Sequence, residues 1–224
     1  MILSHKYKFI FIKTTKTAGT SIEAYLSQFC GDDDVITPIY PAVNGHNPRN
    51  YGGEKINNID QLLPHEFTNL TQTNTFKNHM SAKEIEALVQ PDIWQNYFKF
   101  CVERNPWDKV ISSFYMQKIR SSTILTFDEY LANGNLPVDT HKWFDGRTGK
   151  IMVDEILKYE NLECELGRVL KRLGVPFKNG LNVREKSHYR LNKMPYRNYF
   201  TNQEMIDLVT DKFNLELSLF GYSY

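Results

Sequence analysis

Short apolar runs alternate with amphipathic segments along most of the chain. Residues 9–12, Phe-Ile-Phe-Ile, are apolar without a break, and residues 97–102 form a second strand candidate. Apolar runs of this length are typical of strands buried on both faces, as in a parallel sheet covered by helices. Further short strands are predicted at residues 151–153 and 156–159.

Capping residues mark the predicted helix starts. A capping box at residues 81–84 predicts a helix through Gln90, ended by Pro91. Asn105 and Pro106 suit the N-cap and the first position of a helix with an apolar face. Three more helices are predicted to follow the capping segments at Thr126, Asn161 and Thr201.

Residues 31–78 differ from the rest of the chain. Gly, Pro, Asn and Asp are crowded there and periodicity is weak, which predicts loops and short turns. Long irregular stretches in a domain are usually functional or disordered. The apolar content of this one favours an ordered cover over a site. No repeat or linker divides the chain, so we expect residues 1–224 to form one domain.

Composition narrows the class of protein. With 41% hydrophobic and 24% charged residues the chain is globular, and a net charge of +1 makes any anion site a local feature. Cys30, Cys101 and Cys164 are widely spaced and form no CxxC motif, so neither a disulfide framework nor a metal site is expected. No signal peptide or membrane-spanning run is evident, which predicts a cytoplasmic protein.

The loop after the first strand is a candidate anion site. Lys16 lies among small and hydroxylic residues, and helical spacing resumes at Ser21. A helix start offers free backbone N–H groups and a positive dipole end, and Gly19 allows close approach. Thr17, Thr20 and Ser21 add hydroxyl donors. Because the lysine precedes the glycine by three positions, this is not a Walker A loop, and an ordinary polar turn is the alternative.

The second strand candidate leads into a similar arrangement. Arg104 is expected at the carboxyl end of this strand, and Ser112 lies two turns into the helix that follows Asn105. The simpler interpretation is that Arg104 caps the helix or forms an ion pair locally. Ser112 would then only fill a tight contact. Neither residue identifies a site by itself.

Together the two stretches resemble the signatures of sulfotransferases that use PAPS (3′-phosphoadenosine-5′-phosphosulfate). Residues 16–21, Lys-Thr-Ala-Gly-Thr-Ser, look like the 5′-phosphosulfate-binding loop of that family. The resemblance makes the whole loop cofactor-binding: Lys16, Thr17, Ala18, Gly19, Thr20 and Ser21. Residues 104–112 resemble the family's 3′-phosphate-binding strand and helix, with the same spacing from Arg104 to Ser112. The general run of the chain is similar to the carbohydrate-type branch.

The resemblance implies a fold, a reaction and roles for residues. The fold would be α/β and P-loop-like, with three layers and a central parallel sheet flanked by helices. The reaction would move the sulfuryl group of PAPS to an acceptor hydroxyl or amine and release adenosine 3′,5′-bisphosphate. Lys16 would neutralise the 5′-phosphate and the bridging oxygen, while Arg104 and Ser112 would bind the 3′-phosphate. Positioning, charge stabilisation and a base suffice for such a transfer, without a metal.

A histidine between the two motifs is the expected base. His79 is favoured because it immediately precedes a capped helix, and similar His-x-Ser/Thr-Ala strings recur in this branch. The alternative role for His79 is a hydrogen bond to the backbone at a helix start. His65 is the second candidate, ahead of His46, and Glu66 and Glu103 are less favoured as bases.

The later part of the chain adds less specific candidates. Lys186 and Ser187 fall where the family folds a loop onto the 3′-phosphate, although the local string departs from the expected forms. Glu160 resembles a residue of a recurrent family string and is interpreted as structural. Residues 31–78, with Trp143 and Phe144, could stack on sugar rings of a carbohydrate acceptor. A nucleotide-dependent kinase and a non-catalytic binding protein are the alternative functions.

Overall fold

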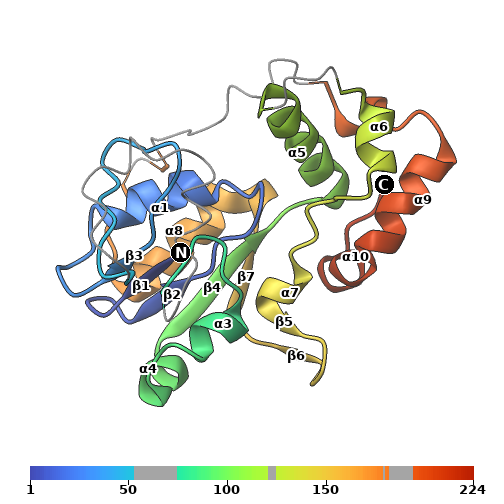
Figure 1. Ribbon diagram of the computed structural model, residues 1–224. Coiled ribbons are helices and arrows are strands. Elements are labelled where there is room, and N and C mark those ends of the chain that lie inside the picture. The colour runs from blue at the N-terminus through green and yellow to red at the C-terminus, as the bar shows by residue number, and fades with distance from the viewer. Residues whose placement is uncertain (53–74, 121–124, 179, 182–193) are drawn as a thin grey trace.

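A five-stranded sheet runs through the computed structural model, which describes residues 1–52, 75–120, 125–178, 180–181 and 194–224 (Figure 1). The strand order is β3-β1-β2-β4-β7. The strands are β1 (Ile2–Ser4), β2 (Phe9–Phe11), β3 (Val35–Ile36), β4 (Phe98–Glu103) and β7 (Glu155–Lys158). β2, β4 and β7 are parallel, and β1 alone is antiparallel to its two neighbours. The predicted α/β fold with a mostly parallel central sheet is confirmed.

Helices begin largely where the capping residues predict. They are α1 (Gly19–Ser27), α3 (Ala82–Glu86), α4 (Pro91–Asn96), α5 (Pro106–Arg120), α6 (Phe127–Ala132), α7 (Thr140–Trp143), α8 (Leu162–Leu173), α9 (Gln203–Lys212) and α10 (Asn214–Phe220), with 3₁₀ turns at Tyr159–Asn161 and Tyr196–Asn198. Ser81 and Thr126 each form a capping box. Asn202 accepts a hydrogen bond from the Met205 N–H (3.0 Å), and Gly174 ends α8 in the left-handed conformation.

Helices cover the sheet on both faces and give the fold three layers. On one face α1 and α8 pack against strand residues that include Phe11, Phe100 and Leu157. On the other face α3, α4 and α7 pack against residues that include Ile10 and Cys101. Because successive side chains of a strand point to opposite faces, a doubly covered sheet needs the unbroken apolar runs seen in the sequence.

A second group of helices stands beside the carboxyl end of β4 (Figure 1). We call it the helical lobe; it comprises α5, α6, α9 and α10. Its apolar core is formed by Trp107, Val110, Ile111, Phe114, Tyr130, Leu131, Phe200, Val209 and Phe213. α5 follows β4 after only two residues, so the lobe stands directly beside the edge at which β2 and β4 end.

Two strand predictions need correction. Residues 151–153 do not add a strand to the central sheet: β6 (Lys150–Ile151) pairs with β5 (Phe144–Asp145) in a separate hairpin. The chain turns back at residues 145–149, which brings the two short strands together. The sequence also did not predict β1 and β3, because strands of three and two residues are too short to show a period.

The helix predicted through Gln90 is also shorter than expected. It ends at Glu86, and Pro91 occupies the first turn of a new helix, α4, where its missing N–H costs nothing. The sequence did not predict α10 as a separate helix. In the parts of the chain that the structure describes, no helix has the length and apolar character needed to cross a bilayer.

Candidate active site

The carboxyl ends of β2 and β4 are tied together where the cationic loop, residues 13–18, begins. The Ile12 N–H donates to the Phe100 carbonyl (2.9 Å), and the Thr14 hydroxyl donates to the Val102 carbonyl. The Thr14 hydroxyl also lies 2.8 Å from the hydroxyl of the fully buried Thr17. These two hydroxyl groups therefore hold the shape of the loop, and a contact from Thr17 to a ligand would come from its backbone.

The loop leads into a helix start that suits an anion. Lys16 and Ala18 both have a left-handed backbone with φ of 62°, which is uncommon for residues other than glycine. Ala18 is the N-cap of α1 and makes no side-chain capping bond, and the first turn, Gly19, Thr20 and Ser21, carries no acidic residue. The positive dipole end of α1 is therefore offset neither by a capping side chain at Ala18 nor by an acidic residue of the first turn.

Lys13 passes beneath this helix start. A Cβ atom at Gly19 would lie only 2.6 Å from Lys13 Cγ, so glycine is required there by the lysine stem. The Lys13 ammonium ends 2.5 Å from a Glu23 carboxylate oxygen, and the amino group of Met1 contacts the other oxygen. Burial would raise the pKa of Glu23, but these two cations lower it to about 2. Sequence reasoning missed Lys13 and Glu23; their only signal is a charge placed within apolar runs.

Arg104 joins the two sequence motifs. Its Nη1 donates to the Lys16 carbonyl at 2.9 Å, while Nε and Nη2 donate to Asp108 at 2.9 and 2.5 Å. The guanidinium also lies 4.0 Å from the centre of the Tyr159 ring. The local ion pair expected as the simpler interpretation is therefore present. The contact with Lys16, 88 positions away in the chain, shows in addition that the two motifs meet.

The remaining 3′-phosphate candidates are placed only in part. Ser112 is half-buried on α5, one turn after Asp108 and so on the helix face that Asp108 presents to Arg104. Lys186 and Ser187 lie outside the described residues. His65 and Glu66, candidates for the base, also lie outside them.

Glu160 has the structural role that was predicted for it. One oxygen of its carboxylate accepts the Asn105 N–H at 2.7 Å, and the other accepts the Tyr222 hydroxyl at 2.8 Å. Glu160 thus fastens the turn between β4 and α5 to the end of the chain. Glu160 also follows Tyr159 in the chain, and the ring of Tyr159 lies beside the Arg104 guanidinium.

His79 lies beside the cationic loop. It is half-buried, has a left-handed backbone with φ of 63°, and its Nδ1 is 3.1 Å from the Lys13 carbonyl. Because a carbonyl only accepts, Nδ1 carries the proton and Nε2 keeps a lone pair. Burial, together with the charges of Lys13 and Lys142, lowers the pKa of His79 to about 3. The backbone contact expected as the alternative is present, and it leaves Nε2 able to accept a proton.

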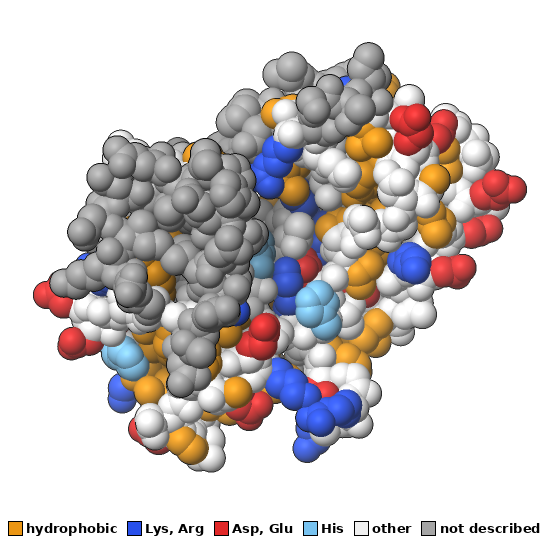
Figure 2. Space-filling view, in the orientation of Figure 1, with side chains coloured by type: hydrophobic (Ala, Val, Ile, Leu, Met, Phe, Trp, Pro, Cys, Tyr) orange, Lys and Arg blue, Asp and Glu red, His pale blue; other side chains and the backbone are white. Residues whose placement is uncertain are grey.

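A buried ion cluster supports the loop from the other side. It consists of Glu103, Lys109, Asp139 and Lys142. Lys109 lies 2.8 Å from Glu103 and 3.1 Å from Asp139, and Lys142 lies 2.5 Å from Asp139. Figure 2 shows this face hollowed between the sheet and the helical lobe, with Lys, Arg and His side chains along the hollow. Sequence reasoning missed Asp139 and Lys142, since an acid and a base three positions apart are common on any helix.

Three expectations about side chains are corrected by burial. Trp143 is fully buried and donates its Nε1–H to Glu103 (2.8 Å), so it cannot stack on a sugar. Glu103 is held by that bond and by Lys109, so it is no base for an acceptor. His46 is also buried, with Nε2 at 2.9 Å from the Thr37 carbonyl. Of the described candidates, only His79 stands at the loop with a ring nitrogen left to act as a base.

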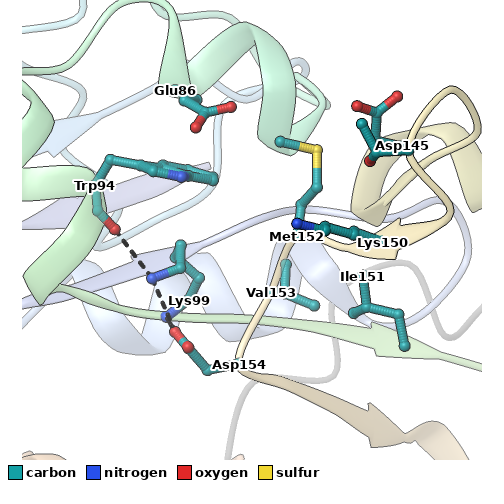
Figure 3. A pocket seen from close by; sticks show the side chains of 10 residues that line it. Glu86, Trp94, Lys99, Asp145, Lys150, Ile151, Met152, Val153 and Asp154 are labelled. Carbon is teal, nitrogen blue, oxygen red and sulfur yellow. Dashed lines mark hydrogen bonds and ion pairs between the residues drawn. The ribbon is translucent and has the colours of Figure 1, made fainter.

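A pocket of about 380 Å³ lies away from this site, between α3, α4 and the β5–β6 hairpin. In Figure 3 the Trp94 ring extends toward Met152, and Glu86 and Asp145 lie at the rim. Lys99, the second residue of β4, forms its floor, so the pocket is at the amino ends of the strands. It therefore belongs to the opposite end of the sheet from the cationic loop.

Grouped metal ligands are not found at either end. In the ranges that the structure describes, no three His, Cys, Asp or Glu side chains are close enough to hold a metal ion together. At the loop, the carboxylates of Glu23, Asp108 and Asp139 are each paired with a cation, and backbone donors of the α1 start lie beside them. Such cations and backbone donors bind phosphate or sulfate esters.

Comparisons with known proteins agree with the sequence motifs. The chain is 35% identical over 104 residues to an uncharacterized protein from Archaeoglobus fulgidus, which covers 43% of this chain and 84% of that protein. The crystal structure of a sulfotransferase from Alicyclobacillus acidocaldarius aligns with 97% of this chain and 96% of its own, with 15% identity and a TM-score of 0.44. The residue profile of the sulfotransferase family matches residues 1–223. This chain therefore belongs to the sulfotransferase family.

Proposed function

We propose that this protein transfers the sulfuryl group of PAPS to an acceptor hydroxyl by in-line displacement, with His79 as the base, and releases adenosine 3′,5′-bisphosphate. The observation that carries the proposal is the 2.9 Å contact between Arg104 Nη1 and the Lys16 carbonyl. It joins, at one edge of the sheet, the two motifs proposed here to bind the phosphates. His79 bonds to the same loop, through the Lys13 carbonyl.

Two groups of donors would divide the cofactor phosphates between them. The α1 start, residues 18–21, and the Lys16 ammonium suit the 5′-phosphosulfate, because they combine backbone donors with a full charge. Arg104 has five N–H donors, of which the described contacts occupy three. The remaining two suit the 3′-phosphate, joined by the Ser112 hydroxyl. Lys186 and Ser187 complete the proposed set.

His79 would take the proton of the acceptor. Its Nδ1–H is held by the Lys13 carbonyl, so the ring is oriented and Nε2 is the basic atom. As the acceptor oxygen bonds to sulfur, the proton moves to Nε2 and the bond to the bridging oxygen breaks. Lys16 would then neutralise the charge on the departing phosphate.

The acceptor is proposed to be a saccharide hydroxyl. Support comes from the resemblance to the carbohydrate-type branch. The sequence-based expectation that residues 31–78 cover the acceptor site stays a prediction, because residues 53–74 of this stretch lie outside the described residues. Trp143 has no part in holding the sugar, because it is buried.

Thermal unfolding with adenosine 3′,5′-bisphosphate, PAPS, ATP or no ligand tests the proposal. A ligand at one hundred times its Kd stabilises the folded state by about 2.7 kcal/mol, a readily measured shift. We expect a shift with the bisphosphate and with PAPS but not with ATP. A shift with ATP alone would favour a kinase, and no shift with any ligand would overturn the proposal.

A further inference from the structure

The ion cluster beneath the cationic loop holds one residue of that loop directly. Asp139 accepts the Thr15 N–H at 2.5 Å with one carboxylate oxygen and the Thr15 hydroxyl at 3.0 Å with the other. Asp139 is only 2% exposed and lies 124 positions from Thr15 in the chain. Thr15 precedes Lys16, whose backbone is left-handed. Asp139 binds the Thr15 N–H and Arg104 binds the Lys16 carbonyl, so the backbone is held on both sides of the Lys16 side chain.

The two lysines of the cluster differ in their surroundings. Lys109 is fully buried between Glu103 and Asp139, and these two carboxylates outweigh burial and raise the pKa of Lys109 above its usual range. Among the described residues, Lys142 contacts one carboxylate, that of Asp139. Its second contact is the Thr15 hydroxyl, at 3.1 Å, so its ammonium lies directly at the loop.

Lys142 retains a donor that the described residues do not use. An ammonium group has three N–H donors. One points to Asp139, and one to the Thr15 hydroxyl, which itself donates to Asp139. The third has no acceptor in the described part of the chain. Leaving a buried donor unused is costly, which favours an anionic ligand as its partner.

The Lys142 ammonium and the candidate base, His79, contact the same loop, at Thr15 and at Lys13. Trp143 and Met80, the neighbours of Lys142 and His79, pack in one apolar cluster. The positive charge of Lys142 contributes, after burial and Lys13, to the lowered pKa of His79. Lys142, through Thr15, and His79, through the Lys13 carbonyl, therefore both contact the cationic loop that would hold the sulfuryl group.

We propose that Lys142 is a second catalytic lysine, which donates a hydrogen bond to a non-bridging oxygen of the sulfuryl group. Asp139 is its positioning residue. This inference rests on the proposed sulfuryl transfer.

Lys16 and Lys142 would then stabilise negative charge on different oxygens during the reaction. The acceptor oxygen forms its bond to sulfur and gives its proton to His79 Nε2. The bond from sulfur to the bridging oxygen breaks, and its electron pair stays with the phosphate, beside Lys16. Lys142 stabilises the oxygens that remain on sulfur throughout.

Calorimetry with Lys142→Met separates this role from a structural one. Adenosine 3′,5′-bisphosphate lacks the sulfuryl group and PAPS carries it. We expect the variant to bind PAPS about tenfold more weakly, the usual effect of losing one charged hydrogen bond, while its affinity for the bisphosphate is unchanged. Turnover should fall by about a hundredfold or more, as after loss of a transition-state donor. Lys142→Arg, which keeps the charge, should recover part of the loss.

Two controls make the outcome decisive. Lys99→Met removes a similarly buried lysine paired with Asp154 (3.0 Å) at the other end of the sheet, and should change neither affinity. If Lys142→Met does not fold, the double variant Asp139→Asn with Lys142→Met is measured in its place. It removes one charge of each sign, so the cluster stays neutral. Equal effects on both ligands, or no effect on either, would overturn the role of Lys142. Failure of the wild-type protein to bind either ligand would instead overturn the proposed function and this inference with it.

Discussion

Two buried lysines at opposite ends of the sheet show how a structural charge differs from a functional one. At the amino end, Lys99 donates to the carbonyls of Trp94 (3.0 Å) and Tyr97 (2.8 Å) and pairs with Asp154 (3.0 Å). All three of its donors are used within the protein. At the carboxyl end, Lys142 uses two of its donors within the part of the chain that the structure describes. Burial is similar for the two lysines, so the unused donor is what distinguishes a group available to a ligand.

The same contrast holds between the two ends as a whole. At the amino end, the pocket wall combines Trp94 and Met152 with acidic and basic side chains of both signs. At the carboxyl end, backbone donors and cations paired with carboxylates gather from three separate parts of the chain: the loop after β2, the end of β4 and α7. Parallel strands make this possible, because their carboxyl ends and the following loops meet at one edge.

The largest expected effect comes from Lys16→Ala. The substitution removes the ammonium but keeps the carbonyl that accepts from Arg104, so the loop keeps its anchor. Turnover should fall by about 10²–10³, because the departing phosphate loses its cation. Steady-state assay with PAPS measures this. The control is Lys99→Met at the other end of the sheet, which should lower the unfolding temperature with little change in turnover. Equal turnover for the two variants would contradict the distinction between a structural and a functional end of the sheet.

A smaller effect is expected for Arg104→Ala. The variant loses both the proposed 3′-phosphate contact and the bond to the Lys16 carbonyl, so the Kd for adenosine 3′,5′-bisphosphate should rise about 10–100-fold. Calorimetry provides the Kd. The matched control is Arg168→Ala, which removes an exposed arginine paired with Glu155 away from the loop. Unchanged affinity in Arg104→Ala would remove the residue from the proposed site.

The smallest change concerns the proton of His79. Burial and the nearby cations lower the pKa of His79 to about 3, so the ring should stay neutral at pH 5 without ligand. Since this value is below the ordinary 6.5, the group stabilises the fold fully above about pH 6.5 and loses that contribution as the pH falls toward 3. An anionic ligand at the loop should raise the pKa.

An NMR titration of the His79 ring can check both statements. His79→Gln identifies its resonance by loss. A midpoint near 6.5 in the ligand-free protein would contradict the proximity of His79 to the two lysines. If adenosine 3′,5′-bisphosphate does not raise the pKa of His79, the bound phosphate does not lie near His79 at the cationic loop.

Local patterns predicted the elements that carry the site. The apolar run at residues 9–12, the hydroxylic loop after it and the Asn105-Pro106 helix start each appear where predicted. Prediction failed where elements were very short, as for β1 and β3, or where proline started a helix instead of ending one. In both cases the neighbours in space, not the local sequence, select the conformation.

The sequence by itself determined the family, the alternation of strands and helices and the two motifs that resemble phosphate-binding segments, because these depend on residues close together in the chain. Only the tertiary structure decided that Arg104 grips Lys16, that Asp139 grips Thr15 and that Trp143 is buried. These pairs are separated by many positions and meet only when parallel strands align their carboxyl ends. No local pattern records such a meeting, since its energy comes from burial and charge pairing across the fold.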